Sequence, residues 1–456
     1  MIHKYNRAGI NLVLDTGSGA VHIVDDAAYR LLDEIGEEEL KTGVFSIPSL
    51  STELKTDFST EVLEKTFQEL LSLYQQGLLY SEDGYGEFKN KTGLAPVKAM
   101  CLNVAHDCNL RCKYCFASTG SFCGVRKLMT VETAKKAIDM LIQLSGSRHN
   151  LEVDFFGGEP LMNFEMVKET VTYARALEQP HNKKFRFTIT TNGLLLTDDK
   201  IEYINKEMKN CVLSIDGRKE VNDRLRVKVN GSGSYDAIVP AYQKLVQARG
   251  DQEYYVRGTY TKYNLDFDKD VLHLYDLGFD QISVEPVVGP ESDDYAIHET
   301  HLKQIEASYD RLMKEMIRRK KEKNGVFNFF HFMVDLEQGP CAIKRLRGCG
   351  SGNEYVAITP DGEIYPCHQF VGNQDYLLGN VEEGITNLPL REAFAQANVY
   401  NKEKCDGCWA KFYCSGGCNA NNYAMNGDIL KPYDLSCKLE QLRLECAIAI
   451  QAAIHS

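Results

Sequence analysis

Three cysteines near residue 110 have a spacing that suits iron–sulfur chemistry. Cys108, Cys112 and Cys115 are separated by three and then two residues, in the segment CNLRCKYC. Thiolates are the ligands that iron–sulfur cores select. Three of them on one short loop hold three irons of a cubane cluster, which leaves the fourth iron open to another molecule. A zinc site is the alternative, but it needs four closed ligands, and His106 is the only nearby candidate.

A second set of cysteines occupies the C-terminal quarter of the chain. An odd total of 15 cysteines, without an export signal, argues against a disulfide framework and favours metal ligation. A zinc ribbon is the alternative for the densest part, Cys405–Cys418. The set comprises Cys349, Cys367, Cys405, Cys408, Cys414, Cys418 and Cys437.

The first motif resembles the CxxxCxxC signature of radical S-adenosylmethionine (SAM) enzymes, with Tyr114 in its aromatic position. The segment Gly157-Gly158-Glu159-Pro160 is similar to the GGEP motif of that family. By this resemblance, the backbone of Gly157 and Gly158 and the side chain of Glu159 meet the amino group of the methionine moiety. The three cysteines would then be the catalytic cluster ligands.

Further similarities extend the resemblance over about residues 98–290. Thr191-Asn192-Gly193 and Ser214-Ile215-Asp216-Gly217 resemble two strand ends of the family, and Ser214 would contact the ribose or the carboxylate of the cofactor. Where the family often has HDxxR, this chain has Asn222-Asp223-Arg224-Leu225-Arg226, so the histidine is replaced. Arg226 is the implied carboxylate partner, and Arg224 is a rival for that role.

The resemblance also implies a mechanism. The methionine amino and carboxylate groups would chelate the open iron, and one electron from the cluster would release a 5′-deoxyadenosyl radical. Because this radical abstracts unactivated hydrogen atoms, the site must exclude water, which a closed barrel achieves.

The second cysteine set resembles the SPASM domain of peptide-modifying radical enzymes, which holds two auxiliary [4Fe–4S] clusters. The resemblance assigns Cys349, Cys367 and Cys418 to an inner cluster. Cys341 is the candidate for its fourth ligand; without it, an open iron would bind a substrate thiolate, and we favour the open site. Three clusters are therefore expected in all. The outer cluster would be fully ligated, by Cys405, Cys408, Cys414 and Cys437.

The elements that must position these residues alternate between strand and helix from about residue 97. Helical stretches such as Val131–Leu144 and Tyr235–Gln247 separate six short apolar runs. This alternation predicts an α/β fold with a parallel sheet, a partial (β/α)6 TIM-like barrel, whose chemistry lies at the C-terminal ends of the strands. The predicted strands are Ala99–Ala105, Val153–Phe156, Phe185–Thr190, Val212–Ile215, Tyr255–Thr259 and Ile282–Glu285.

The N-terminal region has a different pattern. Strands are predicted at Ile10–Asp15 and Ala20–Val24, with Asp25 or Asp26 capping a helix to about Ile35. A second helix follows Ser59 and ends at Gly77, and Leu78-Leu79-Tyr80 is predicted as strand-like. The expected domains are a recognition unit (1–85), a linker (86–97), the barrel (98–325) and an iron–sulfur region (326–456) closed by a helix over about Leu439–Ile454.

The N-terminal unit resembles the winged-helix-like peptide-recognition element of enzymes that modify ribosomally made peptides. Such an element binds a leader peptide by strand addition to an exposed sheet edge. A stabilising cap or a dimerisation arm is the alternative. A nucleic-acid partner is not expected, because the net charge is −12 and the one basic run, Lys314–Lys323, is interrupted by acidic and apolar residues.

Together the three parts resemble a sactipeptide maturase, most of all the maturases of six-cysteine (SCIFF) peptides. The implied reaction joins a cysteine sulfur to the α-carbon of an acceptor residue, and a donor such as flavodoxin or ferredoxin would supply electrons. The alternatives are a formylglycine-forming sulfatase-maturating enzyme, another peptide-crosslinking maturase, and a non-catalytic iron–sulfur electron carrier. With no signal peptide or membrane span apparent, a cytoplasmic location is expected.

Four cysteines fit neither set. Cys101, Cys211 and Cys446 lie in apolar runs and are predicted to be buried structural thiols. Cys123 follows the first cluster loop and is a candidate to face the active site, although a structural role is favoured. Trp409, the only tryptophan, is expected to pack beside the outer cluster.

Overall fold

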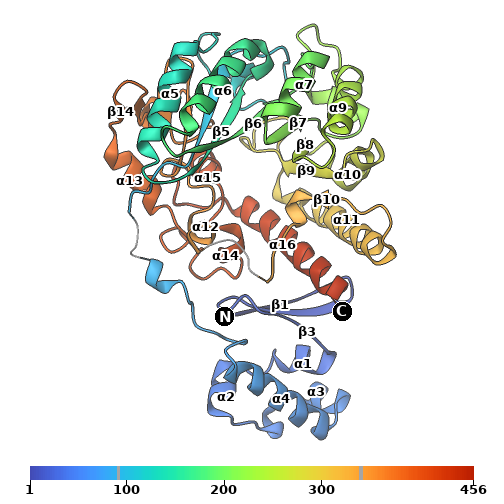
Figure 1. Ribbon diagram of the computed structural model, residues 1–456. Helices are drawn as coiled ribbons and strands as arrows, with labels where there is room; N and C mark the ends of the chain where they lie inside the picture. Colours follow the sequence, from blue (N-terminus) through green and yellow to red (C-terminus); the bar gives the residue numbers. More distant parts are fainter. Residues whose placement is uncertain (90–92, 338–341, 456) are drawn as a thin grey trace.

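The structure, a computed structural model, describes residues 1–89, 93–337 and 342–455. Figure 1 shows a large α/β body above a smaller N-terminal unit, with helix α16 (Asp434–His455) running down from the body to the junction between them. Cys341, the candidate for the fourth ligand of the inner cluster, lies outside the described residues.

The body is built on one 11-stranded sheet, and six consecutive parallel strands form its centre. The order along the sheet is β10-β9-β8-β7-β6-β5-β4-β11-β12-β13-β14. All six strands predicted from the sequence are present, so the expected partial barrel is confirmed. The six central strands are β4 (Ala99–Ala105), β5 (Asn150–Gly157), β6 (Lys184–Thr191), β7 (Asn210–Ser214), β8 (Tyr254–Tyr260) and β9 (Gln281–Pro286).

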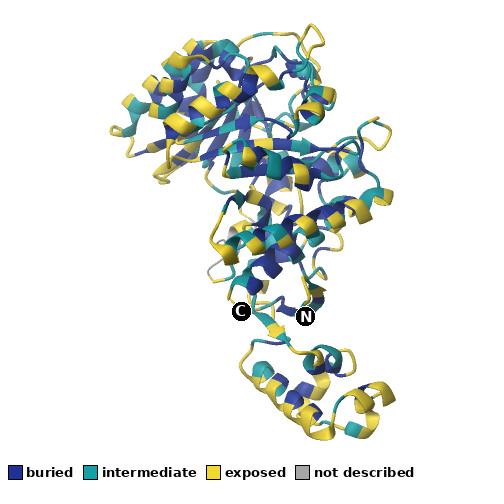
Figure 2. Ribbon diagram, turned by 90° about the vertical axis from the view of Figure 1, so that its right-hand side faces the viewer, coloured by how far each residue is buried: buried dark blue, intermediate teal, exposed yellow. Residues whose placement is uncertain are grey.

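The helices of the barrel cover one face of this sheet. Alternate strand residues such as Val153 and Phe155 of β5 are fully buried against them, while Asp154 and Phe156 are only half-buried on the opposite face. Figure 2 shows these buried strands behind helices whose outer faces are exposed. The helices are α5 (Val131–Leu144), α6 (Phe164–Glu178), α7 (Asp198–Glu207), α8 (Lys219–Leu225), α9 (Tyr235–Arg249), α10 (Phe267–Asp276) and α11 (Leu302–Glu322).

The C-terminal region continues the barrel sheet, which the sequence did not predict. β11 (Tyr355–Ile358) pairs in parallel with β4, so Ala357 lies opposite Cys101. The later strands extend the sheet through antiparallel pairs, and β10 closes its other edge beside β9. These strands are β10 (Asn328–Phe329), β12 (Glu363–Tyr365), β13 (Gly379–Asn380) and β14 (Gly384–Ile385).

Short helices and loops fill the remainder of the C-terminal region, and α16 closes it. This helix begins at Asp434, five residues before the predicted start at Leu439. None of the described helices is long and apolar enough to cross a membrane. The short helices are α12 (Ala342–Arg347), α13 (Leu388–Gln396), α14 (Lys411–Cys414) and α15 (Asn419–Asn426).

The N-terminal unit is a three-stranded antiparallel sheet, in the order β1-β2-β3, with helices on one face. Leu12 and Leu14 of β2 join the core of the body, whereas Val13, on the other face, joins the helical core. The strands are β1 (Ile2–Arg7), β2 (Ile10–Asp15) and β3 (Val21–Val24), and the helices are α1 (Asp26–Leu31), α2 (Glu37–Thr42), α3 (Thr52–Asp57) and α4 (Thr60–Gln75).

Three local predictions for this unit need correction. Strand β1 was missed, because its polar residues have their partners on α16 rather than nearby in the sequence. The first helix ends at Leu31 instead of Ile35. Leu78-Leu79-Tyr80 forms bends rather than a strand, since Tyr80 has a left-handed backbone (φ 54°) and Leu79 packs into the helical core. The predicted cap is confirmed, as Asp25 accepts a hydrogen bond from the Ala28 amide.

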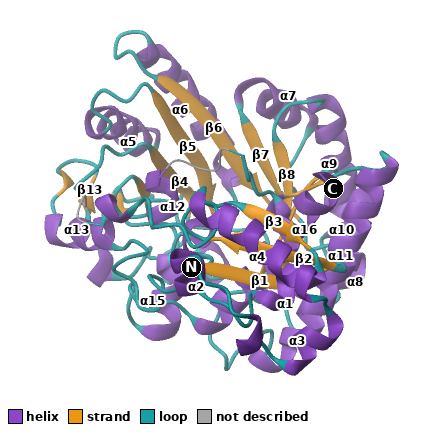
Figure 3. Ribbon diagram, turned by 90° about the horizontal axis from the view of Figure 1, so that it is seen from below, coloured by secondary structure: helices purple, strands orange, loops and turns teal. Residues whose placement is uncertain are grey.

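Ion pairs join the N-terminal unit to the body. Arg7 donates to Glu445 of α16 (Nη2–Oε2 2.8 Å) and to Asp310 of α11 (3.1 Å), and its side chain is only 11% exposed. His3 pairs with the same Glu445 and stacks on Trp409, with ring centroids 3.8 Å apart. Figure 3 views this junction from below, with β1–β3 lying over α16. The unit is therefore docked on the body through β1.

Arg7→Met tests this docking. The substitution leaves Glu445, which is 15% exposed, without its main cationic partner, so we expect a loss of about 2 kcal/mol in the free energy of unfolding. Chemical denaturation followed by circular dichroism measures it. Arg30→Met, which removes a solvent-exposed pair with Asp57 in the same unit, is the control and should change stability little. Equal effects of the two substitutions would contradict the docking role.

Candidate active site

The loop after β4 brings the three first-motif cysteines into one cavity at the C-terminal ends of the barrel strands. Cys108, Cys112 and Cys115 line this cavity. So do most of the other residues that the sequence singled out, which come from the ends of β4, β5 and β7 and from the end of α8: Tyr114, Gly157, Gly158, Ser214 and Arg226. Residues far apart in the sequence therefore meet where the resemblance requires.

The state of the thiols fits a metal cluster. Burial raises the pKa of Cys108 to about 12 and that of Cys112 to about 11, so both stay protonated unless a cation pairs with them. The Leu110 amide already points at the Cys108 sulfur (3.4 Å), as backbone amides do at cluster sulfurs. A cluster held here would have three protein ligands. The donor set thus fits a [4Fe–4S] cluster with one iron left for another molecule.

The two glycines of the GGEP segment allow the β5 end to approach the cluster loop. A Cβ on Gly158 would lie 2.1 Å from the Asp107 carbonyl oxygen, and one on Gly157 would lie 2.4 Å from that of Ala105. Gly157 also has a backbone angle (φ 124°) that favours glycine. The Gly158 amide donates to the Ala105 carbonyl (2.7 Å), which fixes the two strand ends together.

Glu159 has a positioning contact that the sequence did not reveal. Its carboxylate is fully buried and accepts hydrogen bonds from the amides of Leu161 (3.0 Å) and Asn192 (2.7 Å) and from the Thr191 hydroxyl (2.7 Å). It therefore ties the end of β5 to the end of β6 and lies behind the cavity wall. Contact of Glu159 with a cofactor amino group stays a prediction.

Tyr114, Asp216 and Arg226 form a buried polar group in the wall of the cavity. Tyr114 donates to both Asp216 carboxylate oxygens (2.9 and 2.7 Å), and Arg226 Nη1 donates to the Tyr114 hydroxyl (2.9 Å). Nε of Arg226 is buried and has no hydrogen-bond partner among the described residues. An unused guanidinium donor at this point fits a carboxylate ligand. Its rival, Arg224, instead stacks over the Tyr263 ring, 3.6 Å from its centroid.

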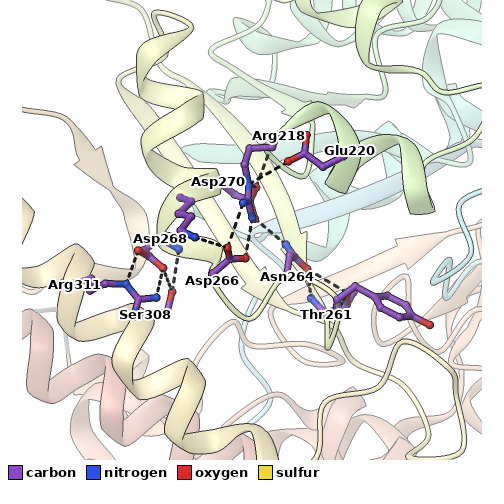
Figure 4. Close-up of polar contacts among 11 residues, drawn as sticks. Arg218, Glu220, Thr261, Asn264, Asp266, Asp268, Asp270, Ser308 and Arg311 are labelled. Carbon is purple, nitrogen blue, oxygen red and sulfur yellow. Dashed lines mark hydrogen bonds and ion pairs between the residues drawn. The ribbon is translucent and has the colours of Figure 1, made fainter.

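A second polar network braces the loop that carries Asp216. The amide and Nε of Arg218 both donate to Asp270 (3.0 and 2.7 Å), and Asn264 Nδ2 donates to the other Asp270 oxygen (3.0 Å). Figure 4 shows these contacts together with the pair of Arg311 and Asp268 (2.7 Å) that joins α11 to α10. Because Asp270 is fully buried, it fixes the β7–α8 connection and with it Asp216.

The C-terminal cysteines gather in two groups. The four assigned to the outer cluster line a single cavity, together with Trp409. Of the inner set, Cys367 has a pKa raised by burial and also by its neighbours Cys418 and Cys349, so these three thiols lie close to one another. Both groups fit iron–sulfur ligation, whereas ligation by Cys341 stays a prediction. The outer cavity contains Cys405, Cys408, Cys414 and Cys437.

The four cysteines that fit neither cluster set differ in burial, and the three predicted to be buried are buried. Cys101, Cys211 and Cys446 are buried. Cys123 is exposed, with its sulfur 2.9 Å from the Ser118 hydroxyl, and it is absent from the residues lining the first cavity.

The sequence did not reveal the charged residues on the interior face of the barrel. Arg257 of β8 pairs with Glu285 of β9 (2.7 Å), and their side chains are still 48% and 34% exposed, so both face open space. Arg257 lies directly beside Ser214 in the sheet register. Arg443 donates to Nδ1 of His331 (2.7 Å), which leaves the ring proton on Nε2, near Ser283 (3.1 Å).

The sequence pattern that could have indicated these residues is the alternation of inward- and outward-facing positions along a strand. Arg257 and Glu285 alternate with buried apolar neighbours, which places them on the same face as Ser214. This alternation alone cannot tell an open barrel interior from a solvated sheet face.

Two protein-family models match the chain. Residues 102–278 match the Radical SAM superfamily, and residues 349–409 match the SPASM iron–sulfur cluster-binding domain. The chain therefore contains a radical SAM domain and, C-terminal to it, a SPASM domain. These matches contain the three-cysteine motif and the first four cysteines of the second set.

Relatives with several different names are similar to most of the chain. A cysteine-type anaerobic sulfatase-maturating enzyme of Clostridium novyi is 26% identical over 70% of this chain and 86% of that protein. The radical SAM cyclopropyl synthase TigE of Paramaledivibacter caminithermalis is 23% identical over 93% and 89%. The subtilosin biosynthesis protein AlbA of Bacillus subtilis is 26% identical over 71% and 68%.

Solved structures share the fold. The sulfatase-maturating enzyme anSMEcpe, with bound AdoMet and a peptide, aligns with a TM-score of 0.63 at 18% identity, covering 78% of this chain and 99% of that one. SuiB of Streptococcus suis, bound to its precursor peptide SuiA, aligns with a TM-score of 0.54 at 14% identity, covering 94% and 97%.

Cys112→Ala tests the first cluster. Losing one of three ligands should remove about four irons per chain and abolish the formation of 5′-deoxyadenosine from SAM. Iron analysis and chromatography of the anaerobically reduced protein measure the two effects. Cys123→Ala, which removes an exposed thiol of the same loop region, is the matched control and should change neither. Normal turnover by Cys112→Ala would contradict its assignment as a ligand.

Proposed function

We propose that this radical SAM SPASM protein forms a thioether crosslink between a cysteine sulfur and the α-carbon of an acceptor residue in a ribosomally made, cysteine-rich peptide. The observation that carries the proposal is the N-terminal unit. The alignments to TigE and SuiB cover 93% and 94% of the chain, whereas those to the sulfatase-maturating enzymes cover 70% and 78%. The additional unit suits a substrate that carries a leader.

The first cavity has the groups needed to hold SAM. Cys108, Cys112 and Cys115 would hold the cluster, and the free Nε of Arg226 would donate to the methionine carboxylate. When bound, the cluster and SAM supply a carbon radical that abstracts a hydrogen atom. The role of the chain is to fix the cofactor and to keep water away; Asp216 and Tyr114 orient Arg226 for the first task.

The interior of the barrel would hold the peptide between the two cluster regions. Arg257 stands beside Ser214 on one side, and its charge also acts on His368, the residue after Cys367, on the other. Burial acts to raise the pKa of Glu285, but the charge and the hydrogen bond of Arg257 outweigh it and keep that pKa below its usual range. An ionised Arg–Glu pair offers a donor and an acceptor, which match the two polar groups of a peptide unit.

The inner auxiliary site would bind the substrate cysteine. If Cys349, Cys367 and Cys418 are its only protein ligands, its open iron would take the thiol as a thiolate and release the proton. Coupling of sulfur to the α-carbon radical frees one electron, which an auxiliary cluster would accept. Ligation by Cys341 is the competing arrangement and would require the thiolate to react without coordination.

The leader would add as a strand to the edge of β3. Within the described chain this strand pairs with β2 alone, and its Ile23 side chain is 49% exposed. The opposite edge strand, β1, lies against α16. An unpaired edge with an exposed apolar side chain is the feature that β-augmentation uses.

Three further functions remain as alternatives, and one of them, another type of peptide-crosslinking maturase, would use the N-terminal unit in the same way. Formylglycine formation is favoured by the similarity to sulfatase-maturating enzymes, but it leaves the N-terminal unit without a role. A non-catalytic electron carrier would need neither the Arg226 site nor the polar barrel interior. We infer a cytoplasmic location and a flavodoxin- or ferredoxin-like electron donor, in keeping with the free thiols.

Co-expression with any short cysteine-rich peptide that is found encoded near the gene decides among these functions. A thioether product loses a pair of hydrogens per crosslink, and tandem mass spectrometry places the link between cysteine and an α-carbon. A formylglycine residue, or a peptide left unmodified while SAM is cleaved, would contradict the proposal.

Ile23→Asp tests the leader site. A charge on the β3 edge should weaken binding of the labelled leader at least tenfold, since it opposes apolar contact there, while SAM cleavage without peptide continues unchanged. Fluorescence anisotropy measures the affinity. Val44→Asp alters another exposed apolar residue of the same unit (65% exposed) and is the control. Equal leader affinity in Ile23→Asp and the unsubstituted chain would contradict strand addition at β3.

A further inference from the structure

Lys402 is a buried lysine in the loop between α13 and the outer-cluster cysteines. It is only 3% exposed. Its ammonium donates to the Gly416 carbonyl (2.8 Å), the Asn419 side-chain oxygen (2.7 Å) and, at longer range, the Gly417 carbonyl (3.5 Å). All three acceptors are neutral oxygens of the segment from Gly416 to Asn419, the first residue of α15.

The fold is shaped around this side chain. A Cβ on Gly416 would lie 2.7 Å from Lys402 Cδ, so the glycine makes room for the lysine stem. Gly416 also has a left-handed backbone (φ 82°), which lets its carbonyl turn toward the ammonium. A lysine placed so specifically is not a solvated surface charge.

The positive charge of Lys402 has no carboxylate partner. Within the described residues, no Asp or Glu oxygen lies within the 4.0 Å that would define an ion pair with its ammonium. The nearby Lys411 differs, because Asp83 pairs with it (3.0 Å). A buried ammonium without a counter-charge is strongly unfavourable, so the site requires negative charge from another source.

Cysteines of both auxiliary sites lie close to Lys402: its carbonyl accepts a hydrogen bond from the Cys405 amide (3.3 Å), and Asn419, which holds its ammonium, follows Cys418 directly. Burial lowers the pKa of Lys402, and four cysteines oppose that effect. Two of them, Cys405 and Cys414, belong to the outer set, and the other two, Cys418 and Cys349, belong to the inner set. When iron holds these sulfurs as thiolates, the two sites supply the missing negative charge from both sides.

We propose that Lys402 is a positioning cation shared by the two auxiliary cluster sites, which stabilises their reduced forms and raises both reduction potentials. One-electron reduction adds a negative charge to a cluster, and a fixed positive charge in a dry site favours that state. The inference rests on the proposed auxiliary clusters and is independent of the peptide reaction. It makes Lys402 a determinant of whether these clusters can accept the electron released in crosslinking.

The test is a redox titration, followed by electron paramagnetic resonance, of the reconstituted full chain without peptide. Lys402→Met should lower the reduction equilibrium constant of each auxiliary cluster at least tenfold. For a one-electron couple this lowers the reduction potential by about 59 mV. The potential of the first cluster should not change. Lys402→Arg keeps the positive charge. Its auxiliary clusters should have reduction equilibrium constants within threefold of those in the unsubstituted protein.

Lys404→Met is the matched control. Lys404 directly precedes Cys405 and carries the same charge, but it is exposed and paired with Asp434 (2.9 Å). Its removal should therefore change the reduction equilibrium constants of the auxiliary clusters less than threefold. Loss of auxiliary iron in Lys402→Met but not in Lys402→Arg would also support the charge role. Unchanged potentials in Lys402→Met, equal shifts in the Met and Arg variants, or iron loss in both would overturn it.

Discussion

Burial raises the pKa of the Cys108 and Cys112 thiols, so both remain protonated unless a metal pairs with them. This coupling between burial and charge is the constraint on which the rest of the molecule depends. A radical that abstracts unactivated hydrogen atoms needs a dry site, but a dry site tolerates charge only in compensated groups. Around the first cavity the structure meets both conditions by giving buried carboxylates cationic or hydrogen-bonding partners: Asp216 has Arg226 and Tyr114, and Asp270 has Arg218.

The parallel barrel makes this arrangement possible. Each strand buries one face against helices and presents the other to the interior, so residues from successive strands meet at one end of the barrel. Because β11 pairs with β4, the SPASM region is part of the same sheet, and the strand pairing fixes it relative to the first cluster loop. The N-terminal unit is docked by Arg7 and His3 on α16 and on Trp409, beside the outer-cluster cysteines. The three parts thus form one connected framework.

Much of this could be predicted from the sequence. Strand–helix alternation gave all six barrel strands, because their apolar runs are short and regularly separated by helices. Cysteine spacing gave the first site, since three ligands on one loop are a local feature. Long-range contacts could not be predicted: the β4–β11 pair, the Arg257–Glu285 pair and the Arg7–Glu445 pair join residues whose proximity no local pattern encodes. Strand β1 was missed for the same reason, and Glu159 proved to be tied to β6.

The central claim is that the three-cysteine loop holds a cluster with one iron open to SAM. Electron–nuclear double resonance of the reduced protein, with SAM isotope-labelled at the methionine amino nitrogen, tests it most directly. Bound SAM that chelates the open iron should give a hyperfine coupling from the labelled nitrogen to the reduced cluster. A reduced cluster that shows no such coupling at saturating SAM would contradict the account.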